Sequence, residues 1–490
     1  MKRFVMNDKN MKWLRRAADQ IESHMSASQI MMAGFAAAIF FGGFLLSLPF
    51  CNADGKWLNY LDALFTSCSA VCVTGLVTIV PATQFSLLGK VILLLLIQLG
   101  GLGIIVCTMG AFLILRKQIT IRDRVIIQEG FNLNTMSGLV VMLRYVIHGT
   151  FLVEAVGALL YSIQFVPEFG LIRGIWYSVF HSISAFCNAG IDMLGESSLE
   201  LYQVNPVVNL TTMGLIVVSG IGFIVWQDVV LTLQRIRKRK AERTDCQSAQ
   251  GESGHPLSIR RCLQKMKLQS KLAIIMTLIL LFGGALAVFC MEYSNPDTLG
   301  SLSLGEKWMA AMFQSVTTRT AGFFTVPQGL LREQTKFVSC ILMFIGGSPG
   351  GTAGGVKTTT VAILLLTCWS VLKGTEDTEC FRRKVLATTV RTAFSIFTVS
   401  FLAVLLGTMA IVSIEQVPLI DGLYEVVSAV GTVGLTTGIT PGLKAASKMI
   451  IILLMYLGRI GPVTMAILFA AKLGRRKNGR KFPEERVMVG

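Results

Sequence analysis

Long apolar segments dominate this chain of 490 residues and limit what it can fold into. A bilayer core about 30 Å thick is crossed by about 20 apolar residues of helix. Eight segments are long and apolar enough to do so: roughly 30–50, 86–115, 138–163, 206–233, 271–291, 336–369, 385–414 and 447–473. The sequence therefore predicts an all-α polytopic membrane protein with eight transmembrane helices.

Composition excludes several classes of protein. Hydrophobic residues make up 53% of the chain and charged residues 15%, whereas soluble domains carry about a quarter charged residues. The net charge of +17 is spread between apolar blocks and forms no basic polar domain, so we expect no nucleic-acid partner. Cys and His show no metal-ligand spacing, and no nucleophile and base are clustered. The chain is therefore predicted not to be an enzyme and to hold no covalent cofactor.

The distribution of Lys and Arg predicts the orientation in the membrane. Of the 45 basic residues, 33 fall in the first thirty residues, in alternate connections between spans and in the C-terminal tail, while eight fall in the other connections. Cytoplasmic loops are enriched in Lys and Arg. We therefore expect a multi-pass protein of the plasma membrane, of the bacterial inner-membrane type, with both termini cytoplasmic. The basic stretch 234–270 is predicted to be a surface loop, with contact to anionic lipid or a soluble partner as the alternative.

A fourfold repeat divides the chain. Each outward connection contains a half-length apolar stretch that ends in a glycine, at Gly75, Gly190, Gly322 and Gly434. Each predicted repeat is span, pore helix, filter strand and span, and the four repeats surround one pore. The predicted organisation is a cytoplasmic N-terminal segment 1–29, repeat 1 at 30–115, repeat 2 at 138–233, the basic cytoplasmic loop 234–270, repeat 3 at 271–370 with a broken second span, repeat 4 at 385–473 and a cytoplasmic basic tail 474–490.

Irregular backbone at membrane depth needs a physical reason. It persists only where it is buried in protein or faces a water-filled path. Four converging strands can turn carbonyl oxygens inward and replace the hydration shell of a cation, and glycine permits the backbone angles that this requires. Small Ser and Ala residues before each glycine let the half-helices pack closely. The alternative, four unrelated re-entrant or interfacial hairpins, does not explain four copies in register.

These motifs resemble a known family. The strings VCVTGL, FCNAGI, TTRTAGFF and GTVGLTTG together resemble the Trk/Ktr/HKT superfamily of cation transporters, over about residues 30–473. Length makes the chain most similar to the Ktr-type (KtrB-like) potassium-transporting membrane subunit, with TrkH-like proteins second. The resemblance implies a homodimer with one pore per subunit, set in membrane lipid. It also implies a separate cytosolic ring of nucleotide-binding regulatory (RCK/KTN-type) subunits, with potassium as substrate and sodium as a candidate activator.

The resemblance also assigns a selectivity filter, in which backbone carbonyls hold potassium. Members with glycine in all four strands resemble potassium transporters, and this chain has Gly75 in the first. Carried over residue by residue, the filter comprises Val73, Thr74, Gly75, Asn188, Ala189, Gly190, Thr320, Ala321, Gly322, Thr432, Val433 and Gly434.

A Gly-rich run interrupts the sixth apolar segment. It fails the spacing of a phosphate-binding loop, because Val356 separates Gly355 from Lys357, and no strand precedes it. A helix cannot continue through such a run, so we expect two half-spans around an irregular loop. The resemblance places this loop below the filter as a gate; a passive kink is the alternative. The expected gate residues are Gly350, Gly351, Thr352, Gly354, Gly355, Lys357 and Arg459.

Charged residues inside spans should face protein. Arg459 lies near the middle of the last span, and the resemblance places it beside the gating loop, where its charge forms part of the barrier to cations. For Lys357, contact with the gate and simple anchoring of the loop stay open. Arg319 is expected to pack behind the filter or to bond its backbone. Glu154 is expected to be paired within the bundle, with proton carriage as the alternative.

The sequence thus predicts potassium uptake through a four-strand carbonyl filter gated by a Gly-rich loop and an Arg. The alternative is a sodium- or proton-coupled cation symporter that works by alternating access. Such symporters have inverted repeats and broken helices at mid-membrane, whereas the repeats here run parallel.

Overall fold

The computed structural model describes residues 27–114, 139–195, 197–246 and 266–461. Within these residues the fold is helical, which confirms the predicted all-α class; the only named strands there are a two-residue hairpin, β1 (Glu379–Cys380) and β2 (Arg383–Lys384). Four helices are long and apolar enough to cross a membrane: α2 (Ala27–Ser47), α8 (Leu139–Phe169), α13 (Leu268–Glu292) and α17 (Ala387–Glu415). They coincide with the predicted first span of each repeat. The predicted segments 1–29 and 474–490 lie largely or wholly outside the described residues.

A shorter helix follows each of these long helices. The four are α3 (Tyr60–Cys72), α9 (Leu171–Cys187), α14 (Leu304–Thr317) and α18 (Leu419–Gly431). The local sequence explains where two of them begin. Asn59 caps α3 through its side chain, and Ser303 and Glu306 form a capping box at α14. Each ends against an irregular strand of a few residues. We call α3, α9, α14 and α18 the pore helices.

The second helices of repeats 1, 2 and 3 are broken, and here the structure differs from the sequence prediction. A break was expected only in repeat 3, between α15 (Glu333–Phe344) and α16 (Thr358–Leu372). The second segment of repeat 1 also divides, into α5 (Leu87–Leu102) and α6 (Ile104–Ile114). That of repeat 2 divides into α10 (Pro206–Ile221) and α11 (Phe223–Cys246), with a bend of 91°. The breaks fall at Gly103 and Gly222, where φ is +84° and +99°. The last helix in the described residues, α19 (Ala445–Ile460), ends at a similar glycine, Gly461, with φ +96°.

Short elements complete the described chain. They are α4 (Pro81–Gln84) and four single turns of 3-10 helix: η1 (Pro49–Cys51), η2 (Glu200–Tyr202), η3 (Gln328–Leu330) and η4 (Thr440–Gly442).

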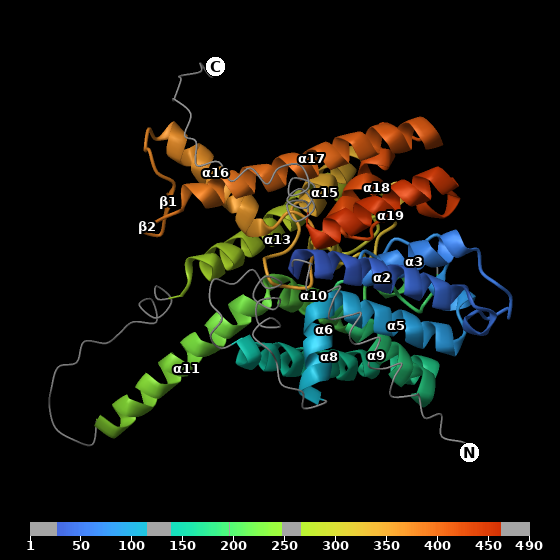
Figure 1. Ribbon diagram of the computed structural model, residues 1–490, viewed down its shortest axis with the longest axis horizontal. Helices are drawn as coiled ribbons and strands as arrows, with labels where there is room; N and C mark the ends of the chain where they lie inside the picture. The colour runs from blue at the N-terminus through green and yellow to red at the C-terminus, as the bar shows by residue number, and fades with distance from the viewer. Residues whose placement is uncertain (1–26, 115–138, 196, 247–265, 462–490) are drawn as a thin grey trace, which may run out of the picture.

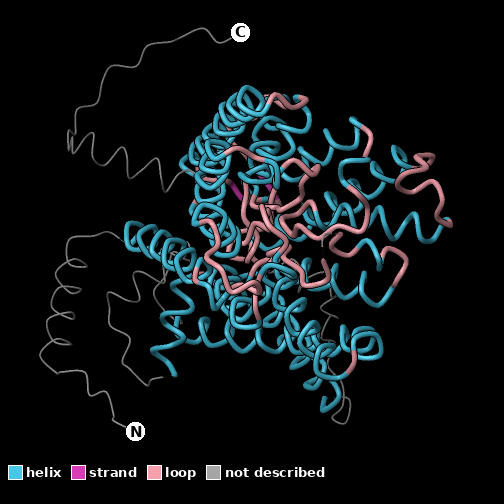
Figure 2. Tube along the Cα trace, turned by 90° about the vertical axis from the view of Figure 1, so that its right-hand side faces the viewer, coloured by secondary structure: helices cyan, strands magenta, loops and turns pink. Residues whose placement is uncertain are grey.

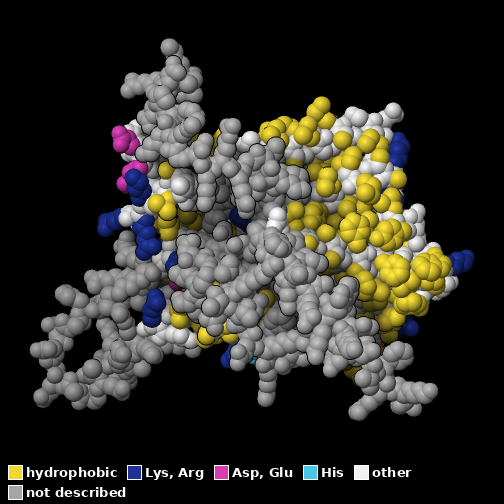
Figure 3. Space-filling model, in the orientation of Figure 1, with side chains coloured by type: hydrophobic (Ala, Val, Ile, Leu, Met, Phe, Trp, Pro, Cys, Tyr) yellow, Lys and Arg dark blue, Asp and Glu magenta, His cyan; other side chains and the backbone are white. Residues whose placement is uncertain are grey.

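The helices form a bundle around a central group of loops. In Figure 1 α2, α5, α8, α17 and α19 lie roughly parallel to one another. Figure 2, which looks along them, shows loops gathered in the middle with helices around them. Hydrophobic side chains spread over the right-hand part of the face in Figure 3. On α2, for example, Phe41 is 63% exposed. Such a surface suits contact with lipid.

One packing unit recurs in all four repeats. A glycine of the long helix meets a side chain of the pore helix and a leucine of the second helix, so closely that an added Cβ would lie 2.5–2.9 Å from both. Small residues at such crossings let membrane helices approach. The four sets are Gly42 with Ser67 and Leu96, Gly157 with Ser182 and Leu215, Gly284 with Ser315 and Leu342, and Gly407 with Val426 and Leu454.

Helix α11 corrects part of the predicted basic loop. The sequence predicts a loop from residue 234, but the helix continues to Cys246. Six of the thirteen residues from 234 to 246 are Arg or Lys, which have high helix propensity. In Figure 1, α11 projects from the bundle at the end where the β1–β2 hairpin also lies. The rest of the predicted loop, from 247 to 265, lies outside the described residues.

Candidate ion filter and gating loop

The strand after each pore helix has the same unusual backbone. The residue two positions before each repeat glycine is not glycine, yet it adopts a left-handed conformation: Val73, Asn188, Thr320 and Thr432 have φ between +51° and +68°. Non-glycine residues rarely adopt such angles, so their recurrence in four equivalent places indicates a constraint imposed by the surroundings. The glycines themselves have φ of +98°, +63°, +82° and +95°.

The four strands lie against one another in a closed ring. A Cβ added to Gly75 would lie 2.6 Å from the carbonyl oxygen of Ala189, in the strand of the next repeat. The same relation holds around the ring, and each glycine faces the carbonyl oxygen that precedes the next glycine. The remaining pairs are Gly190 with Ala321, Gly322 with Val433, and Gly434 with Thr74. The twelve residues that the sequence analysis groups as a filter therefore belong to four strands that meet in one place.

Hydroxyl groups of the pore helices hold the strands from behind. The backbone N–H groups of Gly75 and Gly434 donate to Ser69 Oγ (2.9 Å) and Ser428 Oγ (3.0 Å). In repeat 2, Ser184 Oγ donates to the carbonyl oxygen of Ile191 (2.6 Å). Thr317 makes the equivalent bond in repeat 3, to Phe323. The sequence analysis assigned these small residues only a packing role; each also bonds a strand.

Three hydroxyl groups of the ring have no partner. The hydroxyl oxygens of Thr74, Thr320 and Thr432 are buried and have no hydrogen-bond partner in the structure. Buried polar atoms are normally bonded, so three orphaned hydroxyls in one ring call for a ligand. Carbonyl and hydroxyl oxygens are the groups that replace the hydration shell of an alkali cation.

The Gly-rich loop joins α15 to α16 and is wedged into the break of repeat 2. The backbone N–H of Ser348 donates to the carbonyl oxygen of Gly220 (2.9 Å), and that of Phe223 donates to the carbonyl oxygen of Gly350 (2.9 Å). Breaking α10 at Gly222 frees the groups that bond the loop. Sequence analysis missed this role of residues 219–223; the Gly-Ile-Gly run within an apolar segment was the available signal.

The loop also touches the strand ring. Asn188 Nδ2 donates to Thr352 Oγ1 (3.2 Å), and Thr352 Oγ1 donates to the carbonyl oxygen of Phe186 (3.3 Å). A Cβ on Gly354 would overlap the hydroxyl of Thr432. Thr352 is fully buried. The loop thus lies directly against the strands of repeats 2 and 4. We call residues 346–357, for which the sequence analysis predicts a gating role, the gating loop from here on.

Two cationic side chains bind carbonyl oxygens of the gating loop. Arg459, at the end of α19, donates to the carbonyl oxygens of Thr352 in the loop and of Gly100 in α5, and so connects three parts of the chain. Lys357 Nζ donates to the carbonyl oxygens of Ala353 (2.6 Å) and Gly354 (3.3 Å). Of the two roles left open for Lys357, these bonds correspond to anchoring of the loop.

Glu154 and Arg319 lie outside the ring. Gln98 Nε2 donates to the buried carboxylate of Glu154 (3.0 Å), so Glu154 is paired within the bundle, as expected. Arg319 is 6% exposed, and its Nη1 donates to the carbonyl oxygen of Thr277 in α13 (3.3 Å). Arg319 therefore packs behind the ring, and this bond ties it to a helix and not to a strand of the ring.

Comparison with known proteins identifies the family. A family model described as "TrkH: Cation transport protein" matches residues 4–481. The chain is 36% identical to the "Potassium/sodium uptake protein NtpJ" of Enterococcus hirae, over 96% of this chain and 99% of that protein. It is also 36% identical to the "Ktr system potassium uptake protein B" of Bacillus subtilis, over 99% and 100% of the two chains. The crystal structure of the potassium transporter TrkH from Vibrio parahaemolyticus shares the fold, with a TM-score of 0.68 at 18% identity over 91% of this chain and 86% of that one. The chain therefore belongs to the TrkH family of cation transport proteins and is a membrane transporter, not an enzyme.

Proposed function

We propose that this protein takes up potassium through a pore whose filter is the four-strand ring. The observation that carries the proposal is the cyclic contact of Gly75, Gly190, Gly322 and Gly434 with the carbonyl-bearing residue of the next strand. The named relatives, which are potassium or potassium/sodium uptake proteins, support the choice of substrate. Potassium sheds its water at the carbonyl oxygens and orphaned threonine hydroxyls of the ring. Uptake by this route needs no covalent cofactor.

The membrane potential supplies the driving force. It contributes about 2.3 kcal/mol per unit charge per 100 mV, enough for roughly fortyfold accumulation of a monovalent cation. Sodium is the candidate activator that the family resemblance implies, and the name of one relative gives sodium beside potassium as an ion that it takes up.

The gating loop controls passage below the filter. Its contacts with Asn188 and Thr432 put it against the inner part of two strands, where a shift of the loop changes the width of the path. Arg459 holds the loop to α5 and adds a positive charge that opposes the passage of cations. Opening then requires the Arg459 bonds to break or to move with the loop.

The proposed assembly is a homodimer in the plasma membrane with both termini cytoplasmic. The excess of Lys and Arg in alternate connections supports this orientation. A cytosolic ring of nucleotide-binding subunits would regulate it. The names of two relatives as parts of a "Ktr system" support a protein that works with other subunits.

A selectivity experiment tests the filter. Gly434→Ser places a side chain where a Cβ would collide with Thr74, so potassium selectivity over sodium should fall in flux assays. Gly442→Ser is the matched control, because a Cβ there meets nothing within 4 Å. Potassium uptake should be rescued in a transport-deficient cell by the wild type and by the control. Unchanged selectivity in a folded Gly434→Ser protein would contradict the filter.

A further inference from the structure

A single acidic residue lies behind the filter at the position nine residues before the repeat glycine. In repeat 4 this residue is Glu425, in pore helix α18, and it is 0% exposed. The equivalent positions in repeats 1, 2 and 3 hold Thr66, His181 and Phe313. Repeat 4 therefore has a buried carboxylate where the other three repeats have none.

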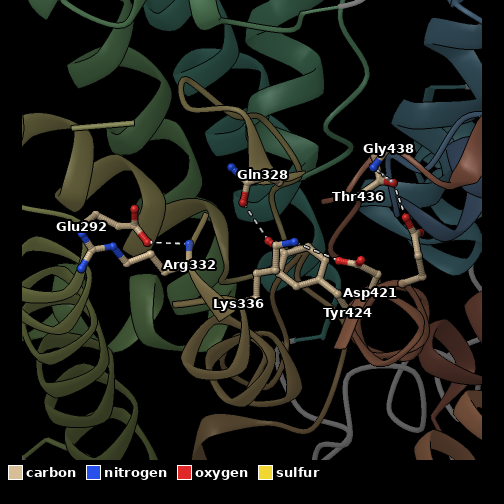
Figure 4. A network of polar contacts seen from close by, with 9 residues as sticks. Glu292, Gln328, Arg332, Lys336, Asp421, Tyr424, Thr436 and Gly438 are labelled. Carbon is tan, nitrogen blue, oxygen red and sulfur yellow. Dashed lines mark hydrogen bonds and ion pairs between the residues drawn. The ribbon is translucent and has the colours of Figure 1, made fainter. Parts of the chain in front are cut away.

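Hydrogen-bond donors surround the carboxylate of Glu425. The backbone N–H of Gly438 donates to Thr436 Oγ1 (3.0 Å; Figure 4), which leaves the Thr436 hydroxyl proton free to be donated to Glu425. Thr440 Oγ1 lies 3.1 and 3.0 Å from the two carboxylate oxygens and 2.8 Å from Thr436 Oγ1, so its single proton is shared among these acceptors. These surroundings suit an ionised carboxylate, which can only accept hydrogen bonds.

Within the described residues no Lys, Arg or His forms an ion pair with Glu425. Lys336 of α15, which reaches α18 one turn before Glu425, is already paired, because its Nζ lies 3.0 Å from Asp421 Oδ1 (Figure 4). A buried charge is costly unless an opposite charge lies close to it. Thr436, which bonds Glu425, follows Gly434 by two residues, and each residue of chain spans at most about 3.6 Å.

We propose that the counter-charge of Glu425 is the permeating cation, so that Glu425 sets the affinity of the outer part of the filter for potassium. The inference rests on the proposed filter and adds a positioning residue to it. The carboxylate acts through space and through the Thr436 bond, and it does not touch the ion. Because only repeat 4 has a carboxylate at this position, the filter is electrostatically asymmetric.

Glu292 offers a matched control in the same protein. It is also 0% exposed, and it accepts bonds from Asn295 Nδ2 (2.6 Å) and from the backbone N–H of Arg332 (3.0 Å; Figure 4). Its partners tie the end of α13 to surface loops, and none belongs to a filter strand. Removing its charge therefore disturbs a buried acid without changing the filter.

The test measures potassium uptake into proteoliposomes against potassium concentration. Two unit charges about 10 Å apart at an effective dielectric constant of about 20 attract enough to change affinity roughly tenfold. Glu425→Gln should therefore raise KM for potassium about tenfold and leave the maximal rate within about twofold. Glu425→Asp, which keeps the charge but withdraws it by one methylene, should give an intermediate KM, about threefold above that of the wild type. Glu292→Gln should lower thermal stability and leave KM unchanged.

Three results would overturn the inference. They are an unchanged KM in Glu425→Gln, an equal rise in Glu292→Gln, and no rescue by Glu425→Asp. If Glu425→Gln does not fold, Glu425→Asp is the test of the inference. Its shorter side chain moves the charge away from the filter and should raise KM about threefold, so an unchanged KM contradicts the inference. If Gly434→Ser loses selectivity while Glu425→Gln keeps its KM, the filter stands and only this inference fails. If Gly434→Ser keeps its selectivity, both fail.

Discussion

Lys448 Nζ lies 2.7 Å from Asp62 Oδ1 and joins the first turn of α19 to the first turn of pore helix α3. The pair Lys336 and Asp421 makes the same contact between α15 and α18, at 3.0 Å. In both pairs the lysine follows a repeat glycine by fourteen residues and the aspartate precedes one by thirteen. Repeat 4 is thus tied by ion pairs to repeat 3 on one side and to repeat 1 on the other.

We expect the Lys448–Asp62 pair to stabilise the ring where the last repeat meets the first. Both side chains are partly buried, at 15% and 17% exposure, so the pair should be worth more than an exposed one, about 1–3 kcal/mol. Asp62→Lys should lower the melting temperature in detergent, because it places two positive charges together. Lys448→Asp in the same chain should recover most of the loss. A double variant no more stable than Asp62→Lys would show that the charges do not interact.

Arg459 is expected to hold the gate closed. Its guanidinium joins the gating loop to α5, and charge-assisted bonds of this kind contribute about 1.5–3 kcal/mol each. Arg459→Ala should raise basal potassium flux about tenfold or more in proteoliposomes without any regulatory partner. Lys357→Ala is the matched variant, since Lys357 bonds only carbonyl oxygens of its own loop, and its effect should be smaller. Equal flux in wild type and in folded Arg459→Ala would mean that the loop is not the gate.

Two adjacent glycines of α13 provide a test of the recurring packing unit. A Cβ on Gly284 would lie 2.5 Å from Ser315 Oγ and 2.9 Å from Leu342, whereas a Cβ on Gly283 meets nothing within 4 Å. Gly284→Ala should therefore destabilise the protein by about 1–3 kcal/mol through overpacking. Gly283→Ala should be neutral or slightly stabilising, because alanine favours helix. Thermal unfolding of the two variants in detergent checks this, and equal melting temperatures would contradict it.

The sequence predicted some levels of this structure better than others. The spacing of the four glycines was enough to group the four strands that meet in one ring. This was possible because the same short sequence pattern around the glycine recurs in every repeat. One feature of repeat 3 could not be predicted from the sequence. Val316 occupies the position that Ser69 has in repeat 1, and the hydroxyl that bonds the strand comes from the next residue, Thr317. This shift by one residue depends on how α14 ends, which is set by tertiary packing.

The helix breaks show the same limit. Gly103 and Gly222 lie in apolar stretches that are long enough to be read as continuous spans. Each belongs to a short group of glycines, but a glycine costs only about 1 kcal/mol within a helix, so such a group alone does not predict a break. The break at Gly222 is stabilised by bonds to the gating loop, more than a hundred residues away in the sequence. Only the folded arrangement of repeats 2 and 3 reveals it.

Glu154 distinguishes a pore from a proton-coupled symporter. Its carboxylate is buried and accepts a bond from Gln98, and its backbone carbonyl oxygen accepts a bond from Ser182 Oγ (2.6 Å). If Glu154 is a structural partner, Glu154→Gln keeps an acceptor for Gln98, and potassium uptake should continue within about twofold of wild type. Uptake should follow the membrane potential in both proteins and should not change when a proton gradient is imposed at constant potential. A proton carrier predicts the opposite: uptake by the wild type that rises with the imposed gradient, and loss of that response in Glu154→Gln. Gln98→Leu, which removes the partner and leaves the carboxylate, should lower thermal stability without creating any dependence on the proton gradient.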